Sequence, residues 1–540
     1  MKLSKKILKE NLFIILICLS GFLLRMRGIG FGLPFLYNPD EHYFINPSID
    51  MLIGGDLNPH WFGAPGSFIM YLLLLIFSIY FLFGFLSGAL YNLNHLQQLF
   101  TNNPTLFYLS GRILMVIFAV ITIYLIYLIA KKHFNRTIAI LASFCLAMAP
   151  LHIEHSRYIR PDITATMLIM FSIYFLLEFF DKNKNMKLLI LSSLFAGFSI
   201  ATKYTSGLII FPIGIYCLIR DSKEHNLFSK KYLFNSLKIK TFLSRAALFV
   251  FMGFLITAPF VILDYKNAYW GIIYQLRGTH LGHERLPGIQ NHLWYLTNAL
   301  QEGTGGLFFE IFAGIGLIFL LTYKRSYKNY LFLFFPILFF LIIGSMLLRW
   351  DRWFMPLLPF EAILFGIGFY YSYKYIAKNR KFNIFRSKKI LRYAVFSVFA
   401  AALVFASFPT IIDDIRAGTK LQQTDTRTTA KEWIENNLPG GSKIAYEHYA
   451  PHLHVNPAGN FSLMNLKRSK IVSQPLSYYK NQSVDYIIIT DSFKSRYYNE
   501  PEKYPVEISR YEELKNNAKL IKIFNNTENP GPIIEIYHLK

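Results

Sequence analysis

The sequence predicts an all-α polytopic membrane domain followed by a small extracytoplasmic α/β domain. Hydrophobic residues make up 53% of the 540 residues, and charged residues make up only 16%. A typical soluble domain has about 25% charged residues, so the deficit is large. The net charge of +24 lies almost wholly between apolar runs. Together these features exclude a disordered chain, a coiled coil and an ordinary cytosolic enzyme.

The distribution of charge argues for a membrane rather than a nucleic acid. Residues 411–540 contain 17 Lys and Arg against 15 Asp and Glu, a balance of only +2. The other +22 charges lie in residues 1–410, in the short segments that separate apolar runs. An excess of basic residues in such segments follows the positive-inside rule for membrane proteins. We therefore predict no nucleic-acid partner.

Apolar runs of about 17–25 residues are needed to cross a bilayer. With the N-terminus in the cytoplasm, the N-terminal segment and alternate loops together hold 28 of the 39 basic residues before position 411 but only 5 of the 17 carboxylates. This bias places the chain in the cytoplasmic (plasma) membrane with residues 411–540 outside the cytoplasm. We predict about 11 transmembrane helices, near 11–31, 106–130, 136–152, 162–180, 187–202, 204–219, 243–263, 306–322, 329–348, 354–376 and 391–410.

The apolar segment 66–90 does not fit this count. A complete crossing there would move every later basic loop to the outside. We therefore predict a re-entrant or juxtamembrane segment on the outer side. The alternative is a true span paired with another crossing elsewhere in the chain.

The C-terminal part has the pattern of an α/β domain, which gives a transmembrane domain at 1–410 and a second domain at 411–540. The sequence TDTRTTAKEWIENN at 424–437 has helical spacing, and the following glycine pair can end a helix. Three runs rich in isoleucine read as strands: VDYIIITD, AKLIKIF and PIIEIYHL.

Acidic residues on the predicted outer side begin with the adjacent pair Asp40 and Glu41, just after the first span. Adjacent side chains cannot point the same way on a regular strand or helix. One carboxylate can therefore face a reaction centre while the other orients a helix start or a cation. The functional interpretation is a general base at Asp40. The alternative is an acidic N-cap after Pro39.

A dense polar stretch runs from His152 to Asp162, and it contains His155, Arg157 and Arg160. The planar guanidinium group suits phosphate oxygens. The His-x-x-His spacing is only a weak metal signal. The alternative is a mutually paired polar cap on two helices.

Two further cations lie at outer helix ends. Lys203 separates two apolar runs and needs an anion, water or a path to the surface. Arg352 belongs to a stretch that mixes arginines with tryptophans, which suits either a lipid phosphate or an interfacial aromatic belt. Tyr204 follows Lys203 directly, and His283 lies in the long outer loop 264–305. That histidine either lines a site or belongs to a solvated loop.

In the order and membrane position of its motifs, the chain resembles polyprenyl-phosphate-dependent glycosyltransferases of the GT-C class. The family 39-like group, related to protein O-mannosyltransferases and aminoarabinose transferase, is the most similar. The likeness covers nearly the whole chain. It depends on Pro39-Asp40-Glu41, residues 59–65, Ser156 to Asp162, Thr202-Lys203-Tyr204, Arg352 to Pro356, and Asp425-Thr426-Arg427 with Trp433-Ile434.

The resemblance implies an inverting sugar transfer on the outer face from a polyprenyl-phosphate-linked donor. The acceptor would be a lipid, a glycan or a protein. It implies that Asp40 is the catalytic base and Glu41 its acidic neighbour. Ala64-Pro65-Gly66 replaces the mannosyltransferases' His-Pro-Pro-Leu stretch, which argues against protein O-mannosylation. Residues implied to bind the donor phosphate or substrate are Lys203, Arg352, Arg160, Arg157, His155, Asp162, Tyr204 and His283.

Chemistry supports the same interpretation. A carboxylate can take a proton from the acceptor as it attacks the anomeric carbon. Lysine and arginine can stabilise the negative charge that grows on the leaving phosphate, so we predict no metal and no cofactor. The rival classes are a transporter or lipid flippase, and a structural membrane subunit with a binding ectodomain. No clear internal repeat of the kind found in many transporters is present.

Overall fold

The protein is described by a computed structural model that covers residues 2–63, 66–181, 185–224, 227, 229–275, 289–299, 303–378, 388–454, 459–466 and 470–539. Its described residues form two compact units. The first combines Lys2–Met26 with most of the chain from Asp40 to Ile415. The second combines Arg27–Pro39 with the residues after Ile415. The predicted boundary after residue 410 lies in the same helix as this division.

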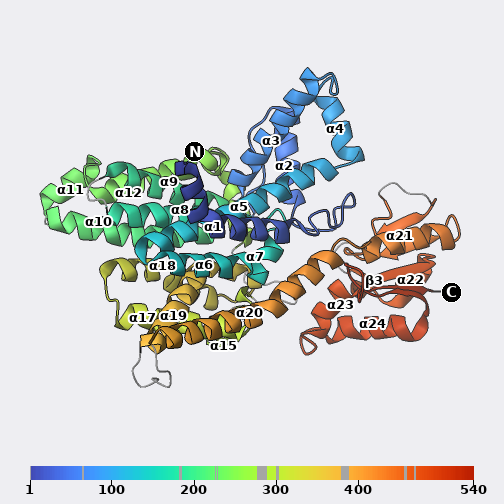
Figure 1. Cartoon of the computed structure of the whole chain (residues 1–540). Helices are drawn as coiled ribbons and strands as arrows, with labels where there is room; N and C mark the ends of the chain where they lie inside the picture. The colour runs from blue at the N-terminus through green and yellow to red at the C-terminus, as the bar shows by residue number, and fades with distance from the viewer. Residues whose placement is uncertain are drawn as a thin grey trace. The chain divides into compact units, whose positions relative to one another are not determined.

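The first unit is helical (Figure 1). In chain order its elements are α1 (Lys2–Met26), α2 (His42–Gly54), α3 (Ser67–Leu86), α4 (Leu93–Asn102), α5 (Thr105–His133), α6 (Arg136–Ala147), α7 (Pro150–His155), α8 (Pro161–Asp181), α9 (Met186–Thr202), η1 (Tyr204–Ile209), α10 (Ile210–Glu224), α11 (Lys230–Leu237), α12 (Phe242–Thr257), α13 (Phe260–Leu263), α14 (Tyr265–Gln275), α15 (Ile289–Trp294), η2 (Tyr295–Ala299), α17 (Leu307–Thr322), α18 (Tyr327–Gly344), η3 (Asp351–Leu357), α19 (Leu358–Lys378) and α20 (Lys388–Lys420).

Many of these helices are long and apolar enough to cross a membrane, as the sequence predicts. Within the described residues, seven meet that criterion and four shorter helices are also apolar. The seven are Ser67–Leu86, Thr105–His133, Pro161–Asp181, Leu233–Thr257, Tyr327–Gly344, Asp351–Lys378 and Arg392–Lys420. The predicted span 204–219 is not among them, because it consists of the 3₁₀ turn η1 and a 15-residue helix that ends in charged residues.

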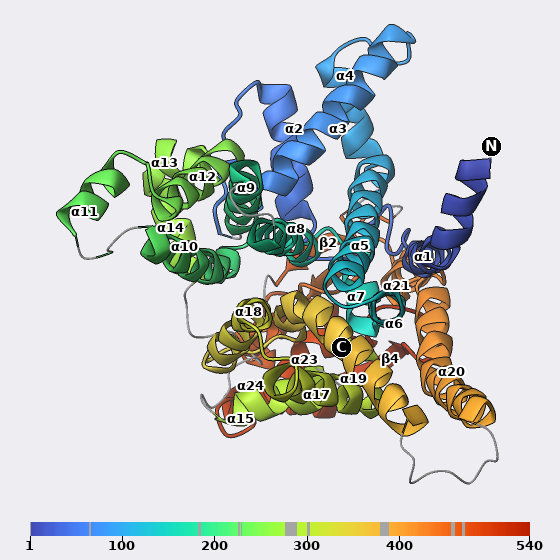
Figure 2. The same ribbon diagram turned by 60° about the vertical axis from the view of Figure 1, so that its left-hand side comes forward.

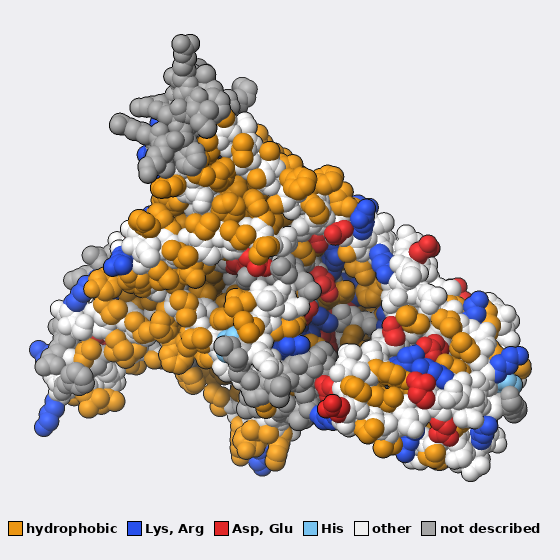
Figure 3. Space-filling view, turned by 90° about the horizontal axis from the view of Figure 1, so that it is seen from below, with side chains coloured by type: hydrophobic (Ala, Val, Ile, Leu, Met, Phe, Trp, Pro, Cys, Tyr) orange, Lys and Arg blue, Asp and Glu red, His pale blue; other side chains and the backbone are white. Residues whose placement is uncertain are grey.

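Helices pack closely where glycines face each other. A Cβ atom at Gly368 of α19 would lie 1.8 Å from the carbonyl oxygen of Phe312, and one at Gly316 of α17 would lie 2.0 Å from that of Leu364. Small residues allow this backbone approach, which is a common way for membrane helices to associate. The face of this unit that Figure 3 shows carries many exposed hydrophobic side chains, as a surface in contact with lipid requires.

The second unit is an α/β fold. Its elements after α20 are α21 (Thr426–Asn437), β1 (Lys443–Tyr446), β2 (Ser462–Asn465), η5 (Lys470–Ser473), α22 (Leu476–Asn481), β3 (Tyr486–Thr490), α23 (Asp491–Tyr498), α24 (Pro505–Asn517), β4 (Lys519–Phe524) and β5 (Ile534–His538). The strand order is β2-β1-β3-β5-β4. Strand β1 is parallel to β2 and β3, and β5 is antiparallel to β3 and β4.

Both faces of this sheet are covered, and β3 is buried throughout its length. One core contains Ala430 and Ile434 from α21, and the opposite core contains Tyr511 and Leu514 from α24. The predicted helix and all three predicted strands are present. The predicted fold class, a helical membrane domain with a small α/β domain, is therefore confirmed.

Candidate active site

The centre of the site is the Asp40 carboxylate, which precedes α2 and is 35% exposed. Arg160 lies between α7 and α8, and its Nη2 is 3.1 Å from Asp40 Oδ2. Arg352 lies in η3, and its Nη1 is 3.0 Å from the same oxygen. Three segments more than a hundred residues apart in the sequence therefore meet at one oxygen atom.

Arg160 and Arg352 are each oriented by further neighbours. Nδ1 of the buried His155 lies 3.3 Å from Arg160 Nη1, and the Arg160 guanidinium stacks on the ring of Tyr158. Burial, and then the charge of Arg160, lowers the pKa of His155 to about 4. His155 is therefore neutral at neutral pH, and its Nδ1 lone pair can accept from the arginine. The Arg352 guanidinium lies 4.8 Å from the ring centre of Trp350.

A second ion pair joins α8 to the end of α9. Lys203, the C-cap of α9, lies 2.5 Å through Nζ from Asp162 Oδ1. Asp162 is in the first turn of α8, where an acidic residue also favours the helix dipole. Both side chains are largely buried, at 14% and 3% exposure. Asp162 is thus the anion that Lys203 pairs with in this structure, and phosphate binding by Lys203 stays a prediction.

Glu41 has a different environment from Asp40, although the two are adjacent. Its Oε2 accepts from Arg112 Nη2 at 2.6 Å, and its Oε1 accepts from Arg112 Nε at 2.8 Å and from the Ile159 amide at 3.0 Å. Both side chains are fully buried. Glu41 therefore fixes the start of α2 against α5 and the segment that carries Arg160. The buried pairing suits a structural role, and the predicted role of Glu41 beside Asp40 stays a prediction.

The sequence did not single out Arg112. It is the one charged residue in the apolar run 105–130. An ionisable residue inside such a run costs free energy unless it is paired. The presence of an arginine there was therefore the sequence signal that could have identified Arg112.

The structure gives Arg157 and Tyr204 neighbours other than Asp40. Arg157 is buried, and its Nη2 donates to the Leu24 carbonyl of α1 at 3.1 Å. Burial lowers the pKa of Arg157. Tyr204 lines an apolar cavity beside Lys203. His283 lies outside the described residues.

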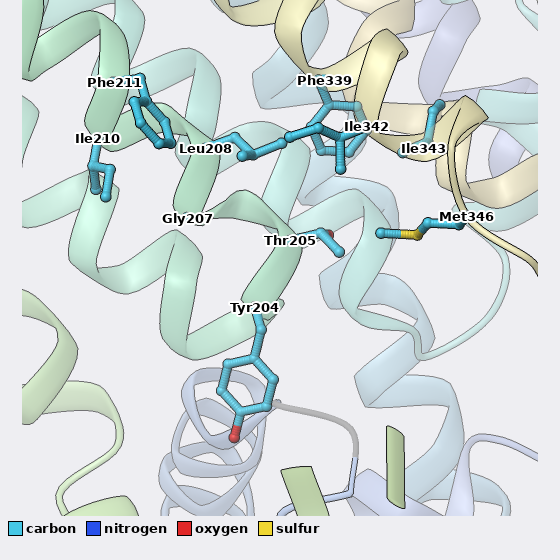
Figure 4. A pocket seen from close by; sticks show the side chains of 10 residues that line it. All are labelled: Tyr204, Thr205, Gly207, Leu208, Ile210, Phe211, Phe339, Ile342, Ile343 and Met346. Atoms are coloured by element: carbon cyan, nitrogen blue, oxygen red, sulfur yellow. The ribbon is translucent and has the colours of Figure 1, made fainter. Parts of the chain in front are cut away.

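The apolar cavity has a volume of about 280 Å³ and opens between η1, α10 and α18 (Figure 4). One of its lining residues, Tyr204, directly follows Lys203 in the chain. Gly207 lies in its wall, and no atom is within 4 Å of the place where a Cβ would be. The lining residues are Tyr204, Thr205, Gly207, Leu208, Ile210, Phe211, Phe339, Ile342, Ile343 and Met346.

The contact between Asp40 and Arg160 also bears on helix α3. The two residues lie at the same end of the helical unit, so the chain between them crosses the membrane an even number of times. Two crossings are provided by helix α5, with 29 residues, and by the stretch 136–152, which contains α6 and the start of α7. Helices α2 and α4 are not among the described helices that are apolar enough to add one.

Helix α3 has the length of a span, yet a complete crossing would make the count odd. In both Figure 1 and Figure 2, α3 and α4 extend beyond the ends of the other helices. By length and composition α3 could span a membrane, so the re-entrant or juxtamembrane segment at 66–90 stays a prediction.

Comparison with known proteins gives a family match for part of the chain. Residues 93–256 match a family model described as dolichyl-phosphate-mannose-protein mannosyltransferase. Comparison with curated protein sequences finds no match. Metal sites offer no alternative within the described residues, which contain no group of three His, Cys, Asp or Glu side chains suited to an ion.

Solved structures give matches over nearly the whole chain. The archaeal oligosaccharyltransferase AglB from Archaeoglobus fulgidus, in complex with an inhibitory peptide and a dolichol-phosphate, matches at a TM-score of 0.58 with 12% identity. That match covers 99% of this chain and 75% of the AglB chain. ArnT from Cupriavidus metallidurans, bound to undecaprenyl phosphate, matches at 0.52 with 12% identity, covering 98% of both chains. At such identities the likeness shows the fold.

Proposed function

The chain has the GT-C glycosyltransferase fold and resembles the polyprenyl-phosphate-dependent enzymes of that class, and we propose that it is such an enzyme. It would transfer a sugar from a polyprenyl-phosphate-linked donor to an acceptor on the extracytoplasmic face, with inversion. The observation that carries the proposal is the half-open Asp40 carboxylate, held by Arg160 and Arg352 at one end of a helical membrane unit.

Asp40 is the general base in this proposal. Its carboxylate takes the proton of an acceptor hydroxyl or amine, and the acceptor atom forms a bond to the anomeric carbon. The bond between that carbon and the phosphate oxygen breaks, and its electron pair goes to the phosphate. A single displacement of this kind inverts the anomeric centre. General base catalysis of this kind contributes about 10²- to 10⁴-fold to the rate.

Arg160 and Arg352 connect the base to the leaving group. In the unliganded structure both arginines use Asp40 as their counter-ion. When Asp40 is protonated its negative charge disappears, and one new negative charge appears on the phosphate. The two guanidinium groups can then transfer their interactions from the carboxylate to the phosphate oxygens. Stabilisation of developing charge by preoriented groups often contributes more to enzymatic rate acceleration than any other single effect.

Lys203 and the apolar cavity serve the lipid part of the donor. A polyprenyl chain needs a hydrophobic path, and the cavity beside Tyr204 and Gly207 supplies one within the membrane unit. Lys203 adds a cation at the mouth of that path, with Asp162 as its counter-ion while no phosphate is present. In this way the phosphate and the lipid tail are recognised by neighbouring groups.

The test is release of free polyprenyl phosphate in a membrane preparation. Membranes that contain the wild type, Asp40→Asn or the control Asp50→Asn receive a mixed pool of polyprenyl-phosphate sugars and a cell-envelope extract as acceptor source. Asp50 is an exposed carboxylate of α2, ten residues after Asp40, so it reports on nonspecific loss.

We expect release by the wild type and by Asp50→Asn, and a loss of about 10²-fold or more for Asp40→Asn. The labelled product then identifies the acceptor. Equal release by all three would refute Asp40 as the base. Absence of release from a folded wild type, with movement of the lipid across the membrane instead, would favour a transporter or flippase.

A further inference from the structure

The segment that leads to Asp40 belongs to the α/β unit, although Asp40 itself belongs to the helical unit. Residues Arg27–Pro39 connect the end of α1 to Asp40, and they form part of the second unit. Only one peptide bond separates this segment from the Asp40 residue. The structural state of the segment therefore determines where the backbone enters the site.

Tyr37 anchors this segment to α21. The Arg427 guanidinium lies 3.9 Å from the centre of the Tyr37 ring, and its Nη1 donates to the Tyr37 carbonyl at 3.2 Å. The Tyr37 hydroxyl hydrogen-bonds to Thr428 Oγ1 at 2.9 Å. The ring of His452 meets the Tyr37 ring edge-on at 5.4 Å. Tyr37 is 4% exposed, and three residues of α21 and the loop after β1 therefore contact a buried side chain.

Arg427 is itself rigidly held. Its Nε and Nη2 donate to the two carboxylate oxygens of Asp425, both at 2.8 Å. Asp425 also caps the start of α21, because its Oδ1 accepts from the Arg427 amide at 2.9 Å. A planar guanidinium can pair with a carboxylate along its edge and stack on a ring with its face at the same time. A lysine at this position could not make both contacts.

The other end of the segment is anchored to the same unit. Arg27 Nε donates to Thr419 Oγ1 at 2.9 Å. Gly28 has a φ of +80°, and a Cβ there would lie 2.7 Å from the Cβ of Leu421. Between Tyr37 and Asp40 the chain is short and stiff, because Pro39 fixes its own φ and restricts Asn38.

We propose that Arg427 is a positioning residue for the base, acting through Tyr37 and the Asn38–Pro39 backbone on Asp40. The inference rests on the proposed function, since it concerns the same carboxylate. Ordering one backbone residue costs about 1–2 kcal/mol, so a released segment would loosen the backbone on the N-terminal side of Asp40, while Glu41 still holds the other side. A catalytic group displaced by about 1 Å can lose about 100-fold in rate. The α/β unit thus takes part in catalysis by holding the segment that carries the base.

The test compares two arginines of the α/β unit in the full-length protein. Arg427→Met removes the contact with Tyr37 and keeps the length of the side chain. Arg496→Met is the matched control. Arg496 also lies over two aromatic rings, but these belong to Tyr449 and Phe493 and not to the segment 27–39. The rate of release of free polyprenyl phosphate gives kcat and the KM for the donor. Hydrogen exchange of residues 28–39 reports on the segment itself.

We expect Arg427→Met to lower kcat about 10- to 100-fold with little change in KM, and to raise hydrogen exchange in 28–39. Arg496→Met should keep both at wild-type values. Faster exchange with an unchanged kcat would overturn the positioning role. A comparable fall in kcat for Arg496→Met would also overturn it, because general damage to the unit would then be sufficient.

A second variant is needed in case Arg427→Met does not fold. If β3 and β5 lose their protection in Arg427→Met, Tyr37→Leu takes its place, since it removes the ring but keeps the Asp425–Arg427 pair. Asp40→Asn is measured in parallel. Full activity of Asp40→Asn would refute the proposed function, whereas a defect in Asp40→Asn with a normal kcat for Tyr37→Leu would refute only the positioning role.

Discussion

Asp40 and Glu41 are consecutive in the chain, yet their carboxylates have opposite surroundings. Asp40 is 35% exposed and shares one oxygen with Arg160 and Arg352. Glu41 is fully buried, and Arg112 occupies both of its oxygens. Because neighbouring side chains at the start of a helix diverge, one carboxylate reaches the open site while the other is locked in the helical core. The two residues should therefore fail in different ways when they are changed.

Glu41→Gln should destabilise the helical unit, whereas Asp40→Asn should leave its stability almost unchanged. Removing one member of a buried ion pair leaves the other charge uncompensated, at a cost of about 3–5 kcal/mol. Thermal unfolding in detergent micelles measures the difference. Arg112→Met combined with Glu41→Gln should recover part of the loss, because no isolated charge then remains. Equal stabilities for Glu41→Gln and Asp40→Asn would contradict the assignment.

Asp40→Asn should bind free polyprenyl phosphate more tightly than the wild type. The variant removes the carboxylate that competes with phosphate for Arg160 and Arg352. Arg352→Gln should weaken the same binding by about tenfold, since a charge-assisted hydrogen bond contributes about 1.5–3 kcal/mol. Titration of the purified protein with polyprenyl phosphate measures both. Weaker binding by Asp40→Asn would mean that the arginines do not hold the phosphate.

Gly207→Leu should raise the KM for donors with a long polyprenyl chain. The position has space for a side chain, and its φ lies outside the left-handed region, so the leucine fills the cavity without strain. Each buried CH₂ group contributes about 0.8 kcal/mol. If two or three CH₂ groups of the donor lose their place in the cavity, the KM should therefore rise roughly 10-fold or more. Kinetics with a long-chain donor and a short water-soluble analogue measure it. Gly207→Ala is the control, and an equal effect on both donors would refute a tail site here.

The α/β unit should lose stability as the pH rises from about 4.5 to about 7. Burial raises the pKa of Glu447 to about 7, and its neighbours are the Tyr511 hydroxyl and the Thr490 amide. A raised carboxyl pKa means that the folded state holds a proton that the unfolded state releases. The stabilisation is complete below about pH 4.5 and is lost by about pH 7, with a total of about 3 kcal/mol.

Pulse proteolysis of the full-length protein between pH 5 and pH 8 tests this. Glu447→Gln should flatten the pH dependence, because its amide does not titrate. The exposed carboxyl group of Glu512 offers a control, and Glu512→Gln should keep the wild-type profile. A pH-dependent profile that persists in Glu447→Gln would assign the effect to another group.

Much of the fold could be predicted from the sequence because apolar length and charge bias act locally. The three isoleucine-rich strands and the helix after Asp425 were predicted for the same reason. Strands β1 and β2 were not, since KIAY and SLMN are only four residues long, β1 depends on β3 for its pairing, and β2 depends on β1. Their existence is a tertiary effect that no local pattern contains.

The candidate site was predictable only in part. Membrane sidedness already put Asp40, Arg160, Lys203 and Arg352 on one face, and the structure brings Asp40 together with the two arginines. The partner of each charge was not predictable, because pairing depends on helix packing. Arg157 illustrates this, since it lies in the same polar stretch as Arg160 but turns toward the Leu24 carbonyl. The roles of these residues stay predictions until the variants are measured.

The two arginines that share Asp40 also limit how the enzyme can respond to transmembrane voltage. In the proposed reaction, negative charge leaves Asp40 and reappears on a phosphate within reach of the same two guanidinium groups. Voltage acts on a charge in proportion to the fraction of the membrane that it crosses, about 2.3 kcal/mol for one charge across the whole membrane at 100 mV. A displacement confined to one end of the helices crosses little of that field. Sugar transfer should therefore run at the same rate in energised and de-energised membranes.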